Sequence, residues 1–514
     1  MPQVISRHVL SASAADAVLN SSGGLLSPRS DIILEKADGE GTFSAAEGPV
    51  TQYRRTVTTR HIGDAQVEIT ERFDYKLSIG LWWVLFVLPV NHTLRHKRDL
   101  PWWHPPDRFN ARQASVVALL ATLAVLAGFL GTLLGQTITF AREEFGATKS
   151  AQGFALSVVR VSILLTVAIA ALADRRGRRR ILLLAGFGAI VASAATSLAP
   201  NLAALAGIQG LARGLSHAMA LLLFVFALEE SPSGSRAYVT SLLGMAAGLG
   251  SSVAVGLVPL ADLGVAAWRF IFLVALIGLP LLAYAARRLP ESQRFCATQP
   301  VARTKASKQH RRRLVLLAAT SFAVLLFASP ASQLQNDFLR DERNFSATKI
   351  TVFVLLTTWT AGPAMLCAGK LADLRGRRVL ASVGVCAGAL LTLWHFTTAG
   401  WPMWVLLAAG TCMSATTVPS LGVYRAEMFG TIRRSGSNGL VGLAGVAGSA
   451  AGLAIAGVMA DAWGYGTAFS VLVAGPLVVA VIVLLCYPET TRRSLEELNP
   501  QSPSANSPVN AHCP

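Results

Sequence analysis

Four polar side chains interrupt the apolar segments in the first half of the sequence, and their types and spacing suggest a binding site. Gln209, Arg213 and His217 follow one another at steps of four residues, so a helix would place them in one polar stripe. Arg160 is a second arginine inside an apolar run. An arginine in the middle of a membrane costs about 2.5 kcal/mol or more, so it normally faces a cavity or a partner. No carboxylate stands in an obvious pairing position, so these arginines indicate either a cationic cavity for an anionic substrate or bonds to the carbonyls of helix ends.

A second set of polar residues follows Pro330. Proline breaks helices, and a broken helix inside a membrane exposes backbone groups to a cavity. Gln333 and Asn336 come soon after this proline, about one helical turn apart, so we expect them to form the opposite wall of the site. The alternative is that they mark the outer end of the helix. His217 also has two interpretations, because an imidazole carries a proton near neutral pH but serves equally well as a structural hydrogen-bonding group.

A charged motif recurs at a fixed distance along the chain. Leu172 to Arg180 reads LADRRGRRR, and Leu371 to Arg378 reads LADLRGRR. The matched positions, 198 or 199 residues apart, are Asp174 and Asp373, Gly177 and Gly376, Arg178 and Arg377, Glu229 and Glu427, and Arg236 and Arg434. Several signals at one period indicate an internal duplication.

The composition is that of a membrane protein. Hydrophobic residues make up 53% of the chain and charged residues only 14%. A formal net charge of +17 would suit a nucleic-acid binder, but the arginines cluster in short loops between apolar runs, which is typical of loops retained in the cytoplasm. We therefore expect no nucleic-acid partner. The cysteines form no paired spacing, and the sequence has no metal-binding spacing, nucleophile elbow or phosphate loop, so neither an enzyme nor a cofactor is predicted.

The apolar runs predict an all-α membrane protein with twelve transmembrane helices in two six-helix pseudo-repeats, because each run is about as long as a bilayer core requires. The predicted spans are 114–138, 150–172, 180–199, 201–228, 237–260, 266–286, 313–336, 347–370, 379–398, 401–427, 436–460 and 466–487. The predicted divisions are an N-terminal extension at 1–110, a first repeat at 111–286, a linker at 287–312, a second repeat at 313–490 and a tail at 491–514.

Two features of the N-terminal extension suggest local structure. Residues 52–59 and 66–77 alternate in polarity around a Gly63-Asp64 break, which predicts a β-hairpin. Residues 77–90 are apolar but short for a span, and tryptophans flank them, which favours an interfacial helix. The alternative is a thirteenth span.

The basic residues predict the orientation. They gather in the loops at 175–180, 287–313, 370–378 and 433–434, whereas the opposite loops hold few. By the positive-inside rule the first set of loops is cytoplasmic, and so are both termini. We expect a multi-pass protein of the cell membrane.

Both predicted six-helix halves carry a run of the form G/A-x-L-A-D-x-x-G-R-R after the second helix. This arrangement resembles the major facilitator superfamily. The runs Pro290-Glu-Ser and Pro488-Glu-Thr, with Glu229…Arg236 and Glu427…Arg434, resemble signatures of its sugar porter, organic ion and metabolite–proton symporter branches. The resemblance covers residues 114 to 498.

This resemblance implies a monomeric secondary transporter of a small solute, working by alternating access and coupled to protons. It also implies that a cytoplasmic charge network latches the two halves together; its residues are Asp174, Gly177, Arg178, Glu229, Arg236, Asp373, Gly376, Arg377, Glu427 and Arg434. The substrate-binding candidates are Arg160, Gln209, Arg213, His217, Gln333 and Asn336, and an organic anion or metabolite is the expected substrate.

Two departures from the family pattern leave alternatives open. Span 114–138 has no carboxylate, and its one strongly polar group is Gln136, whereas proton-coupled sugar porters usually carry a carboxylate there. Span 237–260 lacks the Gly-Pro pair of drug antiporters. The alternatives are a sugar or organic cation facilitator, and a non-transporting ligand sensor or scaffold on the same fold.

Overall fold

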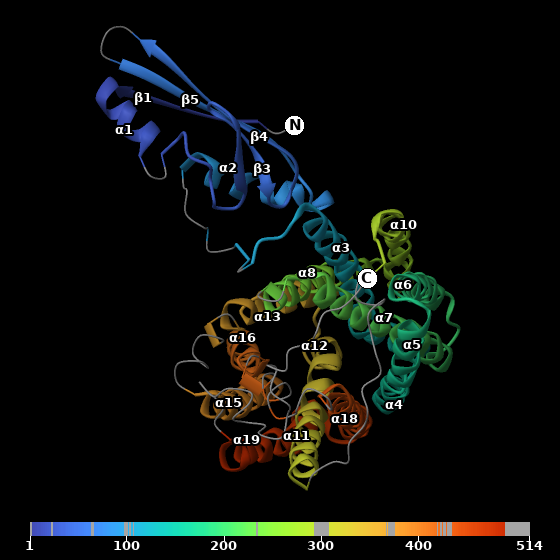
Figure 1. Cartoon of the computed structure of the whole chain (residues 1–514). Helices are drawn as coiled ribbons and strands as arrows, with labels where there is room; N and C mark the ends of the chain where they lie inside the picture. The colour runs from blue at the N-terminus through green and yellow to red at the C-terminus, as the bar shows by residue number, and fades with distance from the viewer. Residues whose placement is uncertain are drawn as a thin grey trace.

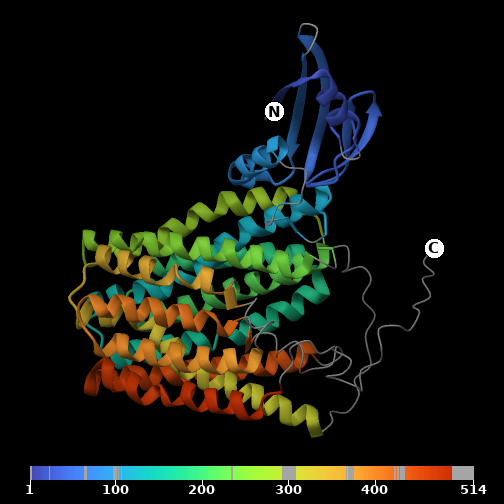
Figure 2. The same ribbon diagram turned by 90° about the vertical axis from the view of Figure 1, so that its left-hand side faces the viewer.

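The computed structural model of the chain describes residues 3–21, 24–62, 66–96, 101, 104–105, 107–232, 235–291, 308–365, 367–368, 376–418, 420–421, 424, 428 and 434–488. A small unit of sheet and helix at the N-terminus stands on a bundle of long helices (Figure 1). Seen from the side, this unit projects away from the bundle and does not merge with it (Figure 2).

The N-terminal unit is built on one antiparallel sheet. Its elements are β1 (Gln3–Ser11), α1 (Ala12–Asn20), β2 (Leu34–Gly39), β3 (Thr42–Glu47), β4 (Val50–Ile62), β5 (Gln66–Leu77), η1 (Gly80–Trp82) and α2 (Trp83–His96). The strand order is β1-β5-β4-β3-β2. Strands β4 and β5 pair from Val50 with Leu77 to Ile62 with Gln66, so the structure contains the predicted hairpin. Strands β1, β2 and β3 were not predicted, and they supply the neighbours that an isolated two-stranded hairpin needs for stability.

Helix α2 covers the sheet and does not form a thirteenth span. Its 14 residues are about 21 Å long, which is short of the roughly 30 Å of a bilayer core. Val90 and Leu94 on one face are buried in the hydrophobic core of the sheet. The other face exposes 59% of Val84, 61% of Leu85 and 74% of Leu88. A helix with one face in a protein core and another apolar face exposed suits a site beside lipid.

The helix bundle has two halves. The N-terminal half contains α3 (Ala111–Phe145), α4 (Lys149–Arg160), α5 (Ile163–Arg176), α6 (Arg178–Ala195), η2 (Thr196–Leu198), α7 (Leu202–Glu230), α8 (Arg236–Gly256), η4 (Val258–Leu263), α9 (Trp268–Leu273), η5 (Val274–Ile277) and α10 (Gly278–Arg288). The C-terminal half contains α11 (Lys308–Gln333), α12 (Gln335–Asp341), α13 (Ala347–Thr358), α15 (Arg377–Thr397), α16 (Trp401–Ala415), α18 (Arg434–Leu472) and α19 (Ala474–Cys486).

Within the described part of the chain, nine helical segments are long and apolar enough to cross a membrane. One of them, Gly439–Cys486, has 48 residues and turns at Gly464, whose φ of 80° is not helical. It therefore covers the last two predicted spans. The predicted spans 347–370 and 401–427 lie partly outside the described residues.

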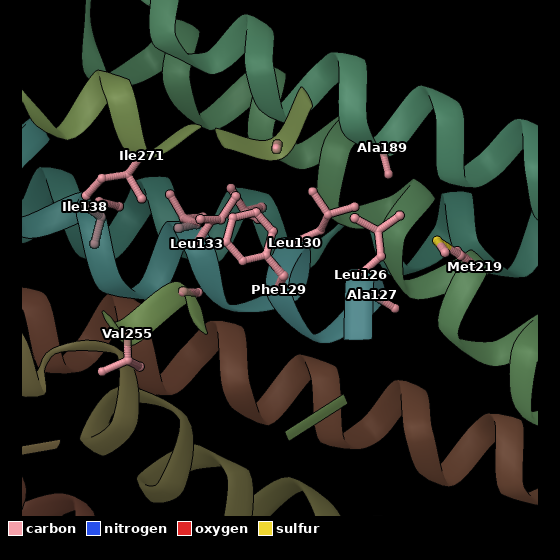
Figure 3. Close-up of a cluster of buried hydrophobic side chains, with 14 of the residues drawn as sticks. Leu126, Ala127, Phe129, Leu130, Leu133, Ile138, Ala189, Met219, Val255 and Ile271 are labelled. Atoms are coloured by element: carbon pink, nitrogen blue, oxygen red, sulfur yellow. The ribbon is translucent and has the colours of Figure 1, made fainter. Parts of the chain in front are cut away.

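Helix α3 runs through the core of the N-terminal half because its sequence is apolar on every side. Its apolar window is 78% buried, against 22% for the span Lys149–Ala173. In Figure 3 its side chains Leu126, Phe129 and Leu133 pack among residues of the surrounding helices, including Met219 and Ile271. A helix that is hydrophobic all round belongs in such a central position.

The two halves repeat each other in backbone detail. Gly177 has φ 98° and ψ 137°, and Gly376 has φ 102° and ψ 136°. These left-handed conformations favour glycine, so both motif glycines form the same tight turn before a helix. Helix packing repeats as well: a β-carbon on Gly250 would lie 1.8 Å from the Val125 carbonyl oxygen, and one on Gly448 would lie 2.1 Å from that of Phe322. The same close approach of helices thus occurs once in each half.

The helix directions place both motif glycines at one end of the bundle. Helix α6 runs from Gly177 to residues 196–199, where Arg269 bonds the Ala199 carbonyl and pairs with Glu144 at the end of α3. Helix α15 runs from Gly376 to Thr398, whose carbonyl accepts a bond from Arg343, just beyond α12. We call the first end the Gly177 end and the other the Asp337 end, after the buried aspartate of α12.

Candidate functional site

The second span is interrupted where it meets α7. Helix α4 ends at Arg160, and α5 begins at Ile163. The interruption packs closely on Gly214 of α7, whose β-carbon would lie 3.0 Å from the Ser162 carbonyl oxygen. The Thr166 hydroxyl also donates to the Gly214 carbonyl at 3.0 Å. Sequence analysis predicted one continuous span here, because no glycine or proline marks the break.

Arg213 lies beside this interruption with much of its hydrogen-bonding capacity unused. The residue is 6% exposed, and its Nε and Nη2 atoms have no hydrogen-bond partner among the described residues. The charge of Arg160 acts on Arg213, and both charges act on His217 one turn further along α7. A buried guanidinium without acceptors is costly. An anion placed between the arginines would supply the missing acceptors and charge.

Arg160 also reaches across to the other half of the bundle. Its Nη2 donates to the Ser329 hydroxyl of α11 at 3.1 Å, and the Ser449 hydroxyl of α18 donates to the same oxygen at 2.6 Å. The site therefore includes groups from both halves. Sequence analysis did not identify Ser329 or Ser449, because serines are common inside apolar helices and nothing distinguishes these two.

The remaining predicted binding residues fall into different places. The Gln209 amide donates to the Thr196 hydroxyl at 2.7 Å. Both residues belong to the N-terminal half, so this amide already has a hydrogen-bond partner there. The Asn336 amide donates to the side-chain oxygen of Gln136 at 3.1 Å and joins α12 to α3. Gln333 lies against Gly135 of α3, and its Oε1 is buried without a hydrogen-bond partner among the described residues.

The predicted break at Pro330 lies in a different position. Pro330 is inside α11, which continues to Gln333, and the interruption falls at Leu334 before α12 begins. Pro330 still accepts a bond from the Leu334 backbone nitrogen, so the chain makes one more turn before it breaks. Gln333 and Asn336 consequently belong to two helices, and not to one face of a single helix.

An ion-pair cluster joins the halves at the Asp337 end. Arg142 at the end of α3 lies 2.7 Å from Asp341 and 3.4 Å from Asp337. Asp337 is fully buried and accepts a bond from the Gln152 amide of α4 at 2.6 Å. Asp337 lies beyond the span that ends at Gln333. Burial raises its pKa to about 7, because the loss of water outweighs the attraction of Arg142.

Two aspartates bind the helix starts of the opposite half in a reciprocal arrangement. Asp262 accepts bonds from the backbone nitrogens of Ala347 and Thr348, each at 2.9 Å, at the start of α13. Asp461 accepts bonds from those of Lys149 and Ser150, at 3.0 and 2.6 Å, at the start of α4. Carboxylates at helix N-termini are favourable because they satisfy free N–H groups and oppose the positive end of the helix dipole.

These two aspartates were missed by sequence analysis although a signal was present. Asp262 and Asp461 are 199 residues apart, which is the step of the internal repeat. A systematic comparison of the two repeats would therefore have found them.

A close helix contact lies beside the second of these caps. A β-carbon on Gly153 of α4 would lie 2.5 Å from the Leu453 carbonyl oxygen of α18, and one on Gly457 would lie 2.8 Å from that of Lys149. Paired glycines thus allow the two halves to touch through their backbones here.

The Gly177 end has a different set of contacts. Arg178 and Glu229, two members of the predicted charge network, form an ion pair within the N-terminal half. The Arg179 backbone nitrogen donates to Glu291 at 3.0 Å. These bonds join residues of the N-terminal half to one another and to Glu291, just after the end of α10. The side chains of Asp174, Arg236 and Arg434, and the whole of Asp373 and Glu427, lie outside the described residues, so this part of the predicted network stays a prediction.

The known proteins that resemble this chain are membrane transporters. A sequence model of the family described as the Major Facilitator Superfamily matches residues 120–408 and 314–509. The multidrug efflux pump LfrA of Mycolicibacterium smegmatis is 30% identical over 184 residues, which is 34% of this chain and 36% of that protein. The chain thus matches about a third of the length of this curated relative.

Solved structures share the fold. The inward-open xylose transporter XylE from E. coli superimposes with a TM-score of 0.63 at 15% identity, over 75% of this chain and 99% of XylE. An inward-facing bacterial homologue of the human lysosomal transporter Spinster gives 0.61 at 15% identity, over 73% and 96%. The nucleoside transporter NupG gives 0.59 at 11% identity, over 72% and 100%. Together with the family match, this confirms the predicted fold class.

Proposed function

The chain belongs to the major facilitator superfamily, and on this premise we propose that this multi-pass membrane transporter carries a small organic anion by alternating access. The observation that carries the proposal is Arg213, which is buried beside Arg160 with two nitrogen atoms unsatisfied among the described residues. Two guanidinium groups suit a carboxylate or a phosphate, because each guanidinium presents a planar fork of N–H donors to the acceptor oxygens.

The position of the arginines supports transport as well as binding. Arg160 and Arg213 belong to the N-terminal half, whereas Ser329 and Ser449 belong to the C-terminal half. An anion held there contacts both halves, so its binding energy depends on how they are arranged. A ligand can shift a conformational equilibrium only through such a difference in affinity. Gln333 is the proposed contact on the C-terminal side, because its amide N–H groups can donate to the anion, and His217 completes the pocket.

The contacts between the halves support a closed Asp337 end. We place the Gly177 end in the cytoplasm and both termini with it, in a cell membrane, because the arginine-rich loops lie at that end. The charge network around Gly177 and Gly376 would then close the cytoplasmic side in the alternate state. Each partly exposed pair adds roughly 0–1 kcal/mol, so such a network holds the halves without locking them.

Asp337 is the proposed proton carrier. It is buried between the halves, and its pKa of about 7 lies well above that of a carboxylate in water. Since the buried state favours the neutral form, a proton taken up from the Asp337 side would favour closure there. Closure at that end opens the cytoplasmic end in an alternating-access cycle, so this direction corresponds to proton-coupled import. No cofactor enters the proposal, and a monomer suffices.

Uptake by the purified protein in proteoliposomes tests the proposal. Arg213→Gln should abolish the binding and uptake of small organic acids, because it removes the buried charge while keeping a polar side chain. Arg287→Gln, an exposed arginine at the end of α10, is the matched control and should behave like the wild type. Anion binding that survives in Arg213→Gln would show that this arginine is structural. Binding without uptake in the wild type would favour the ligand sensor.

Drug export is the second candidate, and one observation favours it: the match to the multidrug efflux pump LfrA. The Arg160 and Arg213 charges would repel a cationic drug, so this candidate conflicts with the anion site wherever the drug is a cation. Vesicles loaded with a cationic dye distinguish drug export from anion uptake. Export of a cationic dye that is unaffected by Arg213→Gln would support efflux and contradict the anion site.

A further inference from the structure

A cavity of about 660 Å³ lies where the N-terminal unit meets the helix bundle. Its walls come from β5 and the start of α2 on one side, and from α3 and α10 on the other. The Trp82 indole nitrogen fixes this junction by donating to the Ala118 carbonyl at 3.0 Å and the Thr122 hydroxyl at 3.1 Å. A volume of this size accommodates a ligand of several hundred daltons.

Among the described residues that line the cavity, the charged ones are Lys76 and Arg288, and none is a carboxylate. Both cations are exposed. Arg288 is held in place by Tyr284, because its Nη1 donates to the tyrosine hydroxyl at 3.0 Å and its guanidinium lies 4.6 Å from the ring centroid. The mouth of the cavity therefore offers an oriented guanidinium and an ammonium to an anion.

The rest of the lining mixes polar and apolar side chains. Its apolar residues include Leu81 and Val87 from the N-terminal unit and Ala118 and Leu119 from α3. Next to the cavity, α2 exposes Val84, Leu85 and Leu88. Large apolar side chains exposed beside such a cavity are unfavourable in water and favourable against acyl chains.

The depth of the cavity in the bundle agrees with a lipid occupant. It lies at the first turns of α3 and the last turns of α10, which are two membrane spans. Arg179, beside Gly177, bonds the Ala286 carbonyl two residues before Arg288, so the cavity belongs to the Gly177 end. The ends of spans lie at the level of lipid headgroups, where tryptophan and basic residues are favoured.

We propose that this cavity binds one anionic phospholipid from the leaflet at the Gly177 end. The phosphate lies between Lys76 and Arg288, and one acyl chain follows Leu119 and Val87. The lipid fills the junction and fastens the N-terminal unit to the first and sixth spans. This proposal depends on the protein being a membrane protein and is independent of the transported substrate.

Binding of radiolabelled phosphatidylglycerol to the purified full-length protein in detergent tests the proposal. The double variant Lys76→Gln with Arg288→Gln should lower the affinity by about 30-fold, from the attraction of two cations near a phosphate. The double variant Lys36→Gln with Arg287→Gln removes the same charge from exposed positions outside the cavity, and it should bind like the wild type. Equal losses in the two double variants would overturn the proposal.

Two further measurements separate a lipid from other occupants. Ser115→Phe fills the cavity without changing a charge, and it should also abolish binding. Phosphatidylcholine and free glycerol 3-phosphate should compete poorly, because the first is neutral and the second has no chains. Competition by glycerol 3-phosphate as strong as that by phosphatidylglycerol would contradict a lipid site, and so would undiminished lipid binding by Ser115→Phe.

Discussion

The two ends of the bundle hold their helices together in different ways. At the Asp337 end, bonds cross between the halves: Arg142 pairs with Asp337 and Asp341, and Asp262 and Asp461 each bind the first turn of a helix in the other half. At the Gly177 end, the bonds between described residues stay within one half, such as Arg178 to Glu229 in the N-terminal half and Tyr424 to Pro488 in the C-terminal half. Among the described residues, the ion pairs and caps that join the two halves therefore gather at the Asp337 end.

The largest expected effect is that of Arg142→Gln. The variant removes the ion pairs with Asp337 and Asp341 that join the halves, and breaking a buried pair costs up to about 3–5 kcal/mol, less where Asp337 takes up a proton. We expect the Asp337 end to open and uptake to be largely lost. Spin labels at Ala203 and Ala399, exposed sites at this end in the two halves, report the distance between the halves. An unchanged distance would mean that the cluster does not close this end.

The helix caps made by Asp262 and Asp461 should give the second-largest effect. Asp262→Asn and Asp461→Asn each weaken one helix cap, worth about 1 kcal/mol. Together they should shift the equilibrium between closed and open forms by up to about 30-fold. Because the caps are related by the repeat, the two single variants should have similar effects. Asp38→Asn, at an exposed position in strand β2, serves as the control, and a shift confined to one of the caps would contradict their equivalence.

The third prediction concerns pH. The pKa of Asp337 is raised in the closed state, whereas in an open, hydrated state the carboxyl would have its ordinary pKa near 4. Protons therefore bind more tightly to the closed state, and closure should weaken as the pH rises from about 4 to about 7. The label distance should show a larger closed fraction at the acidic end of this window. Asp337→Asn should remove the dependence, and a dependence that persists would assign it to another group.

The smallest effect is expected at the Gly177 end. Glu229→Gln breaks a partly exposed ion pair within one half, which is worth about 1 kcal/mol at most. It should lower the melting temperature slightly and leave the label distance unchanged. A clear change in distance would show that this pair also senses the position of the other half.

Much of the bundle could be predicted from the sequence because its signals are local. Apolar runs and the repeat step located the spans, and Gly177 and Gly376 form the turns that the motif required. The Arg160 and Arg213 pair was identifiable because charge inside an apolar run is rare.

The rest depended on contacts that no local pattern encodes. The break after Arg160 follows from close packing against Gly214 in another helix, and not from a helix-breaking residue at the break itself. The role of Asp337 depends on Arg142, which is nearly two hundred residues away. Three strands of the N-terminal sheet were missed. Strands β2 and β3 have six residues each, and β1 is mostly exposed, so these strands become recognisable only beside the hairpin that they complete.

The glycine contact between α4 and α18 has a practical consequence. The backbones at Gly153 and Gly457 are in contact, so one added methyl group at either position would push the two helices apart. Gly153→Ala would therefore keep the Asp337 end from closing fully, and it changes no charge and no residue of the proposed anion site. Such a variant offers a way to trap the outward-accessible form for imaging or for raising conformation-selective antibodies.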